Sequence, residues 1–328
     1  MLINYIFRNK DKGGFSIEEL FNSIGSILIN KTDIKFYELP YSNLSIKSAI
    51  SNLKFVLKKR GIIHITGDVH YVSIIPFKKT ILTIHDVNSI IKGGKLSKFA
   101  KKIIWFWLPA LFVKKITVIS NFTKQQVLNI IPWASSKIEV VYNPVNPALK
   151  TQLKPLLNNK PVVLHLGTKN NKNLENTIKG LQDIDSKLII VGPLSSKHIE
   201  LLNICETEYA NYTNVSFNKI KTLYENCDIV SFISLYEGFG MPIIEAQKVG
   251  RVVITTKMAA IPEIAQDSVH YVDPLDIQDI NAAFTKIINH NQYRNLLINK
   301  GLENVKRFDI NNISNQYLTI YKQLLNEY

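Results

Sequence analysis

Hydrophobic and polar positions follow two recurring patterns along the chain. Short runs rich in β-branched residues are typical of buried strands, and the stretches between them carry apolar residues at helical spacing. In the first half, the predicted strands are 2–7, 34–37, 62–65, 80–84, 116–119 and 138–142. The predicted helices are 16–29, 44–59, 95–113 and 121–130. This alternation predicts a parallel sheet with helices on both faces.

The second half repeats the alternation. Its predicted strands are 162–166, 188–191, 215–217, 229–233, 252–255 and 270–272, and three helical stretches close the chain. Three prolines in residues 143–155 interrupt regular structure and indicate a linker. We therefore predict an α/β protein with two doubly wound, Rossmann-like domains, residues 1–150 and 151–308, and a final helix at 309–328. Ligands of open parallel sheets bind beyond the carboxyl ends of the strands, so two such domains face to face make a cleft.

Composition excludes several classes of protein. The 328 residues are 46% hydrophobic and 20% charged, which excludes disordered and fibrous chains. The apolar stretch 103–113 has 11 residues and contains Pro109, whereas a membrane span needs about 20, so no transmembrane helix is expected. The first residues do not resemble a secretory signal, which makes the cytoplasm the expected location. Cys205 and Cys227 have neither CxxC spacing nor a His cluster, so neither a disulfide framework nor a zinc site is predicted.

The excess positive charge lies in the first half. Residues 1–150 hold 22 Lys and Arg against 8 Asp and Glu, whereas residues 151–328 hold 18 of each kind. A one-sided basic surface attracts acidic lipids, phosphorylated acceptors or nucleic acid, and an ordinary solvated lysine surface is the alternative.

One loop combines glycines with two carboxylates. After the strand 229–233 the chain reads Glu237-Gly-Phe-Gly-Met-Pro-Ile-Ile-Glu245. The glycines allow close approach of a ligand to the backbone, Pro242 suits the first turn of a helix, and the amides of that turn favour a phosphate. Two carboxylates, good acceptors for sugar hydroxyls, then flank that phosphate and suit two different rings.

This segment, with Ala260-Ile-Pro-Glu263 and His270-Tyr-Val-Asp-Pro274 after it, resembles the EX7E retaining glycosyltransferases of family 4, part of glycosyl transferases group 1. The resemblance covers most of residues 161–308 and, more loosely, residues 1–150. It implies the GT-B fold, with an N-terminal acceptor domain, a C-terminal nucleotide-sugar domain, and a C-terminal helix that returns to the first domain.

The resemblance also implies roles in the second domain. Glu237 contacts the donor sugar, Glu245 contacts the ribose, and backbone amides at Gly238, Phe239 and Gly240 face the sugar and diphosphate. The donor-binding residues that it implies are Gly167, Thr168, Lys169, Gly238, Phe239, Gly240, Met241 and Glu245. Lys172, in a segment similar to the family's Lys-Asn, is the expected diphosphate cation. Many relatives add a nearby arginine that this chain lacks, which leaves Lys169 as a substitute candidate.

In the first domain, the weaker resemblance points to strand ends. Gly13 and Gly14 precede the first helix as the family's first glycine loop does, which implies that they also bind the donor. His85 ends the strand 80–84 like the family's histidine beside the donor sugar. His64, Asp68 and His70 lie at or just past another strand end, where we predict acceptor contacts.

The expected chemistry is metal-independent transfer. No Asp-x-Asp pair occupies a strand end, and the family resembled needs neither metal nor cofactor beyond the nucleoside diphosphate sugar as co-substrate. The resemblance implies retention by a front-face reaction, and no residue suggests a covalent nucleophile. A GT-B sugar-nucleotide epimerase, an inactive donor-binding protein and a basic nucleic-acid-binding protein are the alternatives; no motif of nucleic-acid recognition is found.

The segment 92–115 surrounds an aromatic and apolar centre with lysines. This arrangement is typical of an interfacial helix, and a buried helix with a lysine face is the alternative. We expect a glycan or lipid-linked acceptor in cell-surface polysaccharide assembly, with peripheral contact to an anionic membrane through the basic first domain.

Overall fold

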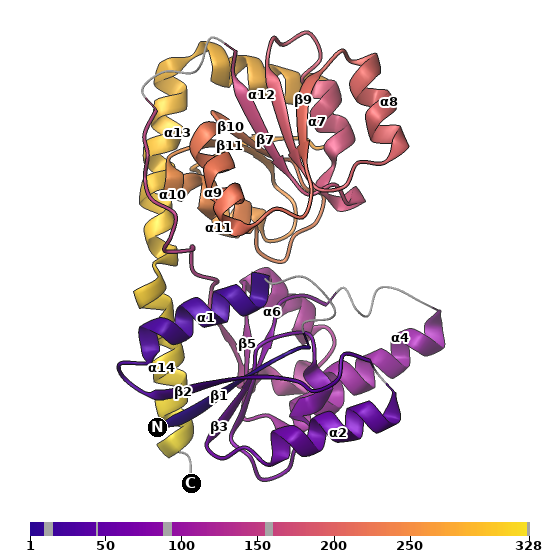
Figure 1. Cartoon of the computed structure of the whole chain (residues 1–328), viewed down its shortest axis with the longest axis vertical. Helices are drawn as coiled ribbons and strands as arrows, with labels where there is room; N and C mark the ends of the chain where they lie inside the picture. The colour runs from indigo at the N-terminus through magenta and orange to yellow at the C-terminus, as the bar shows by residue number, and fades with distance from the viewer. Residues whose placement is uncertain (10–15, 44, 88–93, 155–159, 327–328) are drawn as a thin grey trace. The chain divides into compact units, whose positions relative to one another are not determined.

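The computed structural model describes residues 1–9, 16–43, 45–87, 94–154 and 160–326. The chain forms two compact units (Figure 1): unit 1 is Met1–Pro144 with Asp309–Tyr328, and unit 2 is Val145–Phe308. The boundary therefore lies at residue 144 rather than 150, and the C-terminal segment from Asp309 is part of unit 1.

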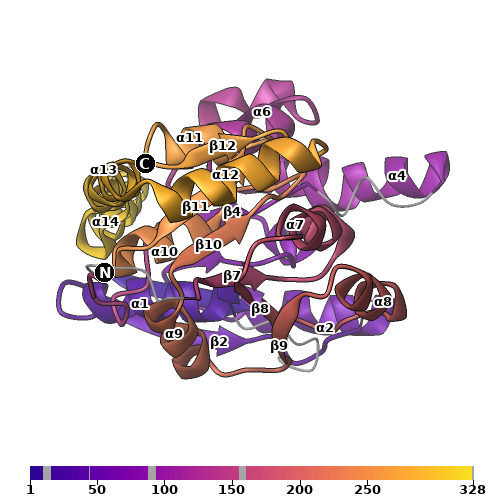
Figure 2. The same cartoon turned by 90° about the horizontal axis from the view of Figure 1, so that it is seen from above.

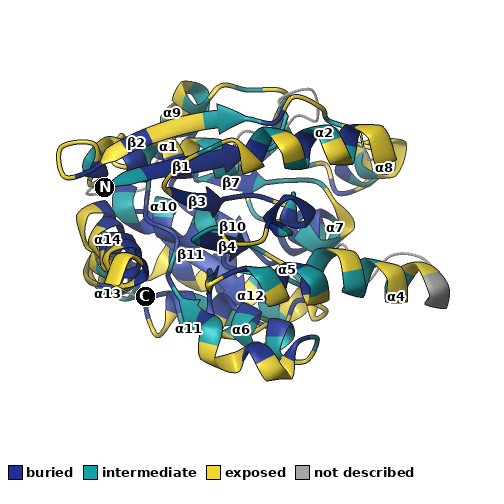
Figure 3. Ribbon diagram, turned by 90° about the horizontal axis from the view of Figure 1, so that it is seen from below, coloured by how far each residue is buried: buried dark blue, intermediate teal, exposed yellow. Residues whose placement is uncertain are grey.

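Unit 1 is a six-stranded parallel sheet with the order β2-β1-β3-β4-β5-β6. Its strands are β1 (Leu2–Phe7), β2 (Asp33–Glu38), β3 (Ile62–Ile65), β4 (Thr80–Ile84), β5 (Lys115–Val118) and β6 (Ile138–Val140). Its helices and short turns are α1 (Ser16–Leu28), α2 (Ile46–Leu57), η2 (His70–Ser73), α4 (Lys95–Lys102), η3 (Ile103–Trp107), α5 (Leu108–Phe112), α6 (Asn121–Leu128), η4 (Pro132–Lys137) and α14 (Ile310–Asn326). Figure 3 shows β1 and β3 mostly buried, whereas the described side chains of α4 are intermediate or exposed.

Each face of this sheet has its own hydrophobic core. Because side chains alternate along a strand, Ile3 and Tyr5 of β1 pack toward α1 and α14, whereas Ile6 faces the other core. The helix α14 contributes Tyr317 and Tyr321, both fully or nearly fully buried, to the first core. The C-terminal helix is therefore an integral layer of unit 1.

Unit 2 is a second six-stranded parallel sheet, with the order β12-β11-β10-β7-β8-β9. Its strands are β7 (Val162–Leu166), β8 (Lys187–Val191), β9 (Glu208–Tyr212), β10 (Ile229–Phe232), β11 (Val252–Thr256) and β12 (His270–Val272). Its helices and short turns are η5 (Asn170–Lys172), α7 (Leu174–Gly180), α8 (Ser196–Ile204), α9 (Phe217–Asn226), α10 (Met241–Val249), α11 (Ile261–Ala265), α12 (Ile277–Asn289), α13 (Asn291–Asn304) and η6 (Val305–Phe308). Helices α7 and α12 pack together on one face, and α9 and α10 lie on the other (Figure 2).

The strand orders position the ligand-binding edges. In unit 2 the order reverses between β7 and β10, and in unit 1 between β1 and β3. At such switch points the loops after neighbouring strands leave in opposite directions and open a crevice at the carboxyl edge. The loops after β7 and β10 hold most of the donor-binding residues that the sequence predicts in unit 2.

Two predicted elements differ from the structure. The strand predicted at 215–217 is wrong: the Ser216 side chain accepts a hydrogen bond from the backbone N–H of Lys219 and caps α9. The edge strand is β9 instead, whose residues are mostly polar and half exposed. The helix predicted at 95–113 is interrupted by a π-helical turn, η3. Among the described helices, none combines the length and hydrophobicity that a bilayer span requires.

Candidate functional site

The loop between β10 and α10 has the backbone that its glycines predict. Gly240 adopts φ 112°, which a residue with a side chain rarely adopts, and α10 begins directly after it with a proline in the first turn. Gly250, at φ 85°, ends the helix. The positive end of the α10 dipole therefore points to the carboxyl edge of the sheet beside Glu237, where an anion is stabilised.

The loop between β7 and α7 places a lysine beside this helix terminus. Gly167 adopts φ 92°, and a Cβ there would lie 3.0 Å from Cγ of Lys172. The glycine thus leaves room for the lysine stem to cross the loop. Thr168 donates a hydrogen bond to the carbonyl of Pro193, at 2.6 Å, while Lys169 is exposed.

The two loops meet in an ion pair. Nζ of Lys172 lies 2.6 Å from Oε1 of Glu237, and the two side chains are 20% and 15% exposed. Asn171 joins the loops as well, because its side chain donates to the carbonyl of Tyr236 at 3.1 Å and its own carbonyl accepts from the N–H of Leu235. An ammonium group has three donors, so Lys172 is able to hold an anionic ligand while it contacts Glu237.

Glu245, the second carboxylate of the motif, is hydrogen-bonded to a tyrosine of the neighbouring helix. Glu245 is partly exposed on α10, and its Oε2 accepts a hydrogen bond of 2.7 Å from the hydroxyl of Tyr224. Phe239 packs its ring on Phe308, with centroids 5.7 Å apart, so its side chain is part of the core of unit 2. Asn171 and Tyr224 were not predicted as site residues, since nothing in their local spacing indicates a partner on another element.

In unit 1, His85 lies directly after β4 as predicted. Its Nε2 is 2.8 Å from the carbonyl oxygen of Thr66, which accepts only, so Nε2 carries the proton. Burial lowers the pKa of the ring, and the neutral tautomer then presents Nδ1 as an acceptor. The contact of His85 to a donor sugar stays a prediction, and Gly13 and Gly14 lie outside the described residues.

Two predicted acceptor contacts are corrected. His64 is fully buried, with Nδ1 2.7 Å from the hydroxyl of Tyr321 and Nε2 2.7 Å from that of Thr83, and burial lowers its pKa to about 3. His70 is also buried: Nδ1 lies 2.8 Å from the carbonyl of Trp105, and burial lowers its pKa to about 4. Neither ring is accessible to an acceptor, because both are buried in unit 1 and hydrogen-bonded within it.

A cluster of charged side chains lies beyond the carboxyl ends of β1 and β3. Arg8 directly follows β1, donates from Nε to Glu18 at 2.9 Å, and lies 3.8 Å from the exposed carboxylate of Asp68. Asp68 therefore remains an acceptor candidate, now with Arg8 and Glu18 beside it. Within the part of the chain that the structure describes, no group of three or more His, Cys, Asp or Glu residues is arranged to hold a metal ion.

The second unit is similar to a known protein family. Residues 151–304 match the family model "Glycosyl transferases group 1". The chain is 25% identical over 234 residues to the O-antigen chain mannosyltransferase B of Escherichia coli, covering 64% of this chain and 61% of that protein. It is 26% identical over 217 residues to the O-antigen chain mannosyltransferase RfbU of Salmonella typhimurium, with coverages of 63% and 60%. The chain thus spans about six tenths of the length of these curated relatives.

A solved structure shows the same architecture. Alr3699/HepE of Anabaena, crystallised with UDP and glucose, superposes with a TM-score of 0.80 over 98% of this chain and 100% of that one, at 16% identity. The fold is the GT-B fold, and the stretch that matches the glycosyl transferases group 1 model, residues 151–304, lies in its second unit.

Proposed function

We propose that this chain is a retaining glycosyltransferase that moves a hexose from a nucleoside diphosphate sugar to a glycan or lipid-linked acceptor in cell-surface polysaccharide assembly. The observation that carries the proposal is the Lys172–Glu237 pair at the switch point between β7 and β10, inside the group 1 domain. The O-antigen mannosyltransferases among the relatives support the polymer class.

The donor half of the reaction follows from the charges of this site. Lys172 and the N-terminal end of α10 attract the diphosphate and stabilise the negative charge that grows on it as the bond to the sugar breaks. Glu237 accepts hydrogen bonds from sugar hydroxyls, and Glu245 accepts them from the ribose. The two carboxylates thereby orient the two ends of the donor around the phosphate site.

The proposed transfer breaks the bond between the anomeric carbon and the diphosphate oxygen and forms a bond from the acceptor oxygen to the same carbon. The acceptor approaches on the face from which the diphosphate leaves, so the anomeric configuration is retained. The departing phosphate takes the proton of the acceptor hydroxyl. No side-chain nucleophile and no metal ion enter this proposed scheme, in which Lys172 supplies the counter-charge.

The test is donor turnover. The protein is incubated with radiolabelled nucleoside diphosphate sugars, beginning with those of mannose and glucose, and release of free nucleoside diphosphate is measured with and without extracted lipid-linked glycans. We expect release that rises with acceptor and labelled sugar in the acceptor fraction. Conversion to an epimeric sugar nucleotide would indicate the epimerase, and binding without turnover the inactive donor-binding protein; either outcome would contradict the proposal.

We also propose that unit 1 contacts an anionic membrane from the cytoplasmic side. The exposed large apolar side chains of this unit include Phe99, Ile104, Trp107 and Leu111. The rings of Phe99 and Trp107 lie 6.4 Å apart. All four side chains lie on the segment that holds Lys98, Lys101, Lys102 and Lys114. An apolar face flanked by lysines suits the boundary between headgroups and acyl chains, where a lipid-linked acceptor is presented.

Flotation with vesicles tests this contact. We expect recovery with vesicles that contain phosphatidylglycerol and little recovery with phosphatidylcholine alone, and less binding at 1 M salt, where the Debye length falls to about 3 Å. Trp107→Ser with Leu111→Ser is expected to weaken binding about tenfold or more, because both apolar side chains leave the bilayer boundary. Leu275→Ser, at an exposed apolar residue of unit 2, is the control. Equal recovery with both vesicle types would contradict membrane contact.

A further inference from the structure

The hydroxyl under Glu245 belongs to a fully buried tyrosine. Tyr224 lies in the last turn of α9 and has no exposed surface, and its hydroxyl donates to Oε2 of Glu245 at 2.7 Å. Glu245 itself is partly exposed on the neighbouring helix α10. The pair therefore joins a core residue to a carboxylate that reaches the carboxyl edge of the sheet.

This hydroxyl is a permanent donor. Burial, and next the negative charge of Glu245, raise the pKa of Tyr224 well above its ordinary value of 10. A protonated hydroxyl has one hydrogen, and Glu245 accepts it. This hydrogen bond consequently holds one oxygen of the carboxylate against α9.

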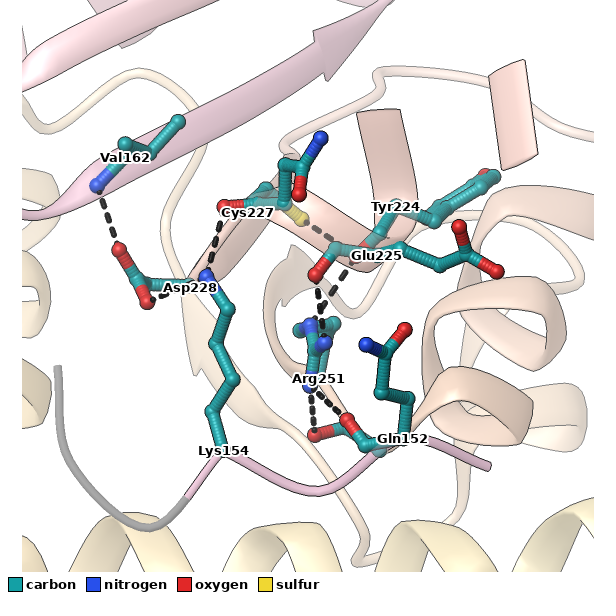
Figure 4. Close-up of polar contacts among 10 residues, drawn as sticks. Gln152, Lys154, Val162, Tyr224, Glu225, Cys227, Asp228 and Arg251 are labelled. Carbon is teal, nitrogen blue, oxygen red and sulfur yellow. Dashed lines mark hydrogen bonds and ion pairs between the residues drawn. The ribbon is translucent and has the colours of Figure 1, made fainter. Parts of the chain in front are cut away.

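The backbone that carries Tyr224 is fixed by a second buried residue, Arg251 (Figure 4). Arg251 is only 2% exposed; its Nε donates to the carbonyl of Tyr224 at 3.0 Å and its Nη2 to that of Glu225 at 2.8 Å. These carbonyls belong to the last turn of α9, where helices leave acceptors unpaired and a cation is favourable. Lys154 satisfies the next one, at Asn226, from the segment that opens unit 2.

Arg251 also holds the helix of Glu245. Its own backbone N–H donates to the carbonyl of Ala246, the residue that follows Glu245, at 2.8 Å. Its Nη1 donates to the carbonyl of Gln152 at 2.8 Å, so the guanidinium group is also bound to the segment before β7. One buried guanidinium residue thus sets the distance between the two backbones that carry Tyr224 and Glu245.

We propose that Tyr224 is a positioning residue that orients the Glu245 carboxylate toward the ribose of the donor, with Arg251 fixing the spacing between α9 and α10. The inference rests on the proposed function, since it assigns Glu245 to the ribose. A freely rotating glutamate would lose side-chain entropy on binding a hydroxyl, and the tyrosine removes much of that cost before the ligand arrives. Tyr224 and Arg251 touch no ligand in this arrangement.

The test uses UDP and GDP as probes, with titration calorimetry on the full chain. For the nucleotide that wild-type protein binds, Tyr224→Phe is expected to raise the Kd about tenfold, because a hydrogen bond to a charged group is lost. In turnover, the same variant is expected to raise the donor KM with little change in kcat, since the ribose is remote from the bond that breaks. Tyr212→Phe, which removes a hydroxyl from β9, is the matched control.

A deoxyribose probe separates positioning from general damage. Of the 2′-deoxy and 3′-deoxy diphosphates, the analogue that lacks the hydroxyl held by Glu245 is expected to bind wild-type protein more weakly, and for that analogue the Tyr224→Phe penalty is expected to disappear. An undiminished penalty with both analogues, or equal Kd values for variant and wild type, would overturn the inference while leaving the proposed function intact. Failure of wild-type protein to bind any nucleotide would overturn both.

Discussion

Replacing Lys172 by methionine is expected to lower kcat for sugar transfer by a factor of about a hundred to a thousand, the usual loss when one group that stabilises transition-state charge is removed. Methionine keeps the apolar stem that crosses Gly167 and removes only the ammonium. In the proposed reaction the diphosphate then departs without the positive charge of Lys172. Steady-state release of labelled nucleoside diphosphate measures the effect.

The matched control is Lys197→Met, which removes an exposed lysine of the same unit, paired with Glu175. Surface pairs of this kind are worth at most about 1 kcal/mol, so turnover should be unchanged. A double variant with Glu237→Gln should lose less than the product of the two single losses, because the residues are in direct contact. Wild-type turnover in Lys172→Met, with unchanged thermal stability, would remove Lys172 from the site.

The largest effect on stability is expected for Tyr321→Ala in α14, a loss of about 3–5 kcal/mol, as for other large buried aromatic side chains. The ring of Tyr321 has no exposed surface and stacks on Tyr317, with centroids 6.1 Å apart. Its hydroxyl bonds Nδ1 of His64 at 2.7 Å. Truncation therefore opens a cavity in the core between the sheet and α14. It also leaves the buried Nδ1 of His64 without this hydrogen-bond partner.

Tryptophan fluorescence during urea unfolding measures this loss in unit 1 alone. The chain has three tryptophans, Trp105, Trp107 and Trp133, all in unit 1. Tyr321→Phe keeps the ring and removes only the hydroxyl, so it should cost less, about 1–3 kcal/mol for the unpaired histidine nitrogen. If Tyr321→Ala left the unfolding midpoint unchanged, α14 would not be part of the folded core of unit 1.

The sequence predicts most strands because central strands of a parallel sheet are buried on both faces and leave continuous β-branched runs. The β9 strand was not predicted because it lacks such a run: it lies at the sheet edge, and Glu208–Tyr212 is largely polar. At residues 215–217, two apolar residues around a serine suggest a strand, whereas the serine caps a helix. A three-residue alternation is too short to outweigh a capping hydrogen bond.

The sequence by itself determined the local geometry of the loop between β10 and α10. Gly240, Pro242 and Gly250 each impose a backbone conformation on their own position, so the strand, turn and helix around Glu237 and Glu245 can be read residue by residue. Local constraints of this kind need no knowledge of the rest of the chain.

Tertiary structure alone decided which side chains meet. Lys172 pairs with Glu237 only because the strand order sets β7 beside β10, and Tyr224 supports Glu245 only because α9 packs on α10. His64 has the same strand-end position in sequence as a ligand-binding histidine, yet α14, arriving from 257 residues away, covers it. Such contacts depend on the order in which strands and helices assemble, which no short pattern contains.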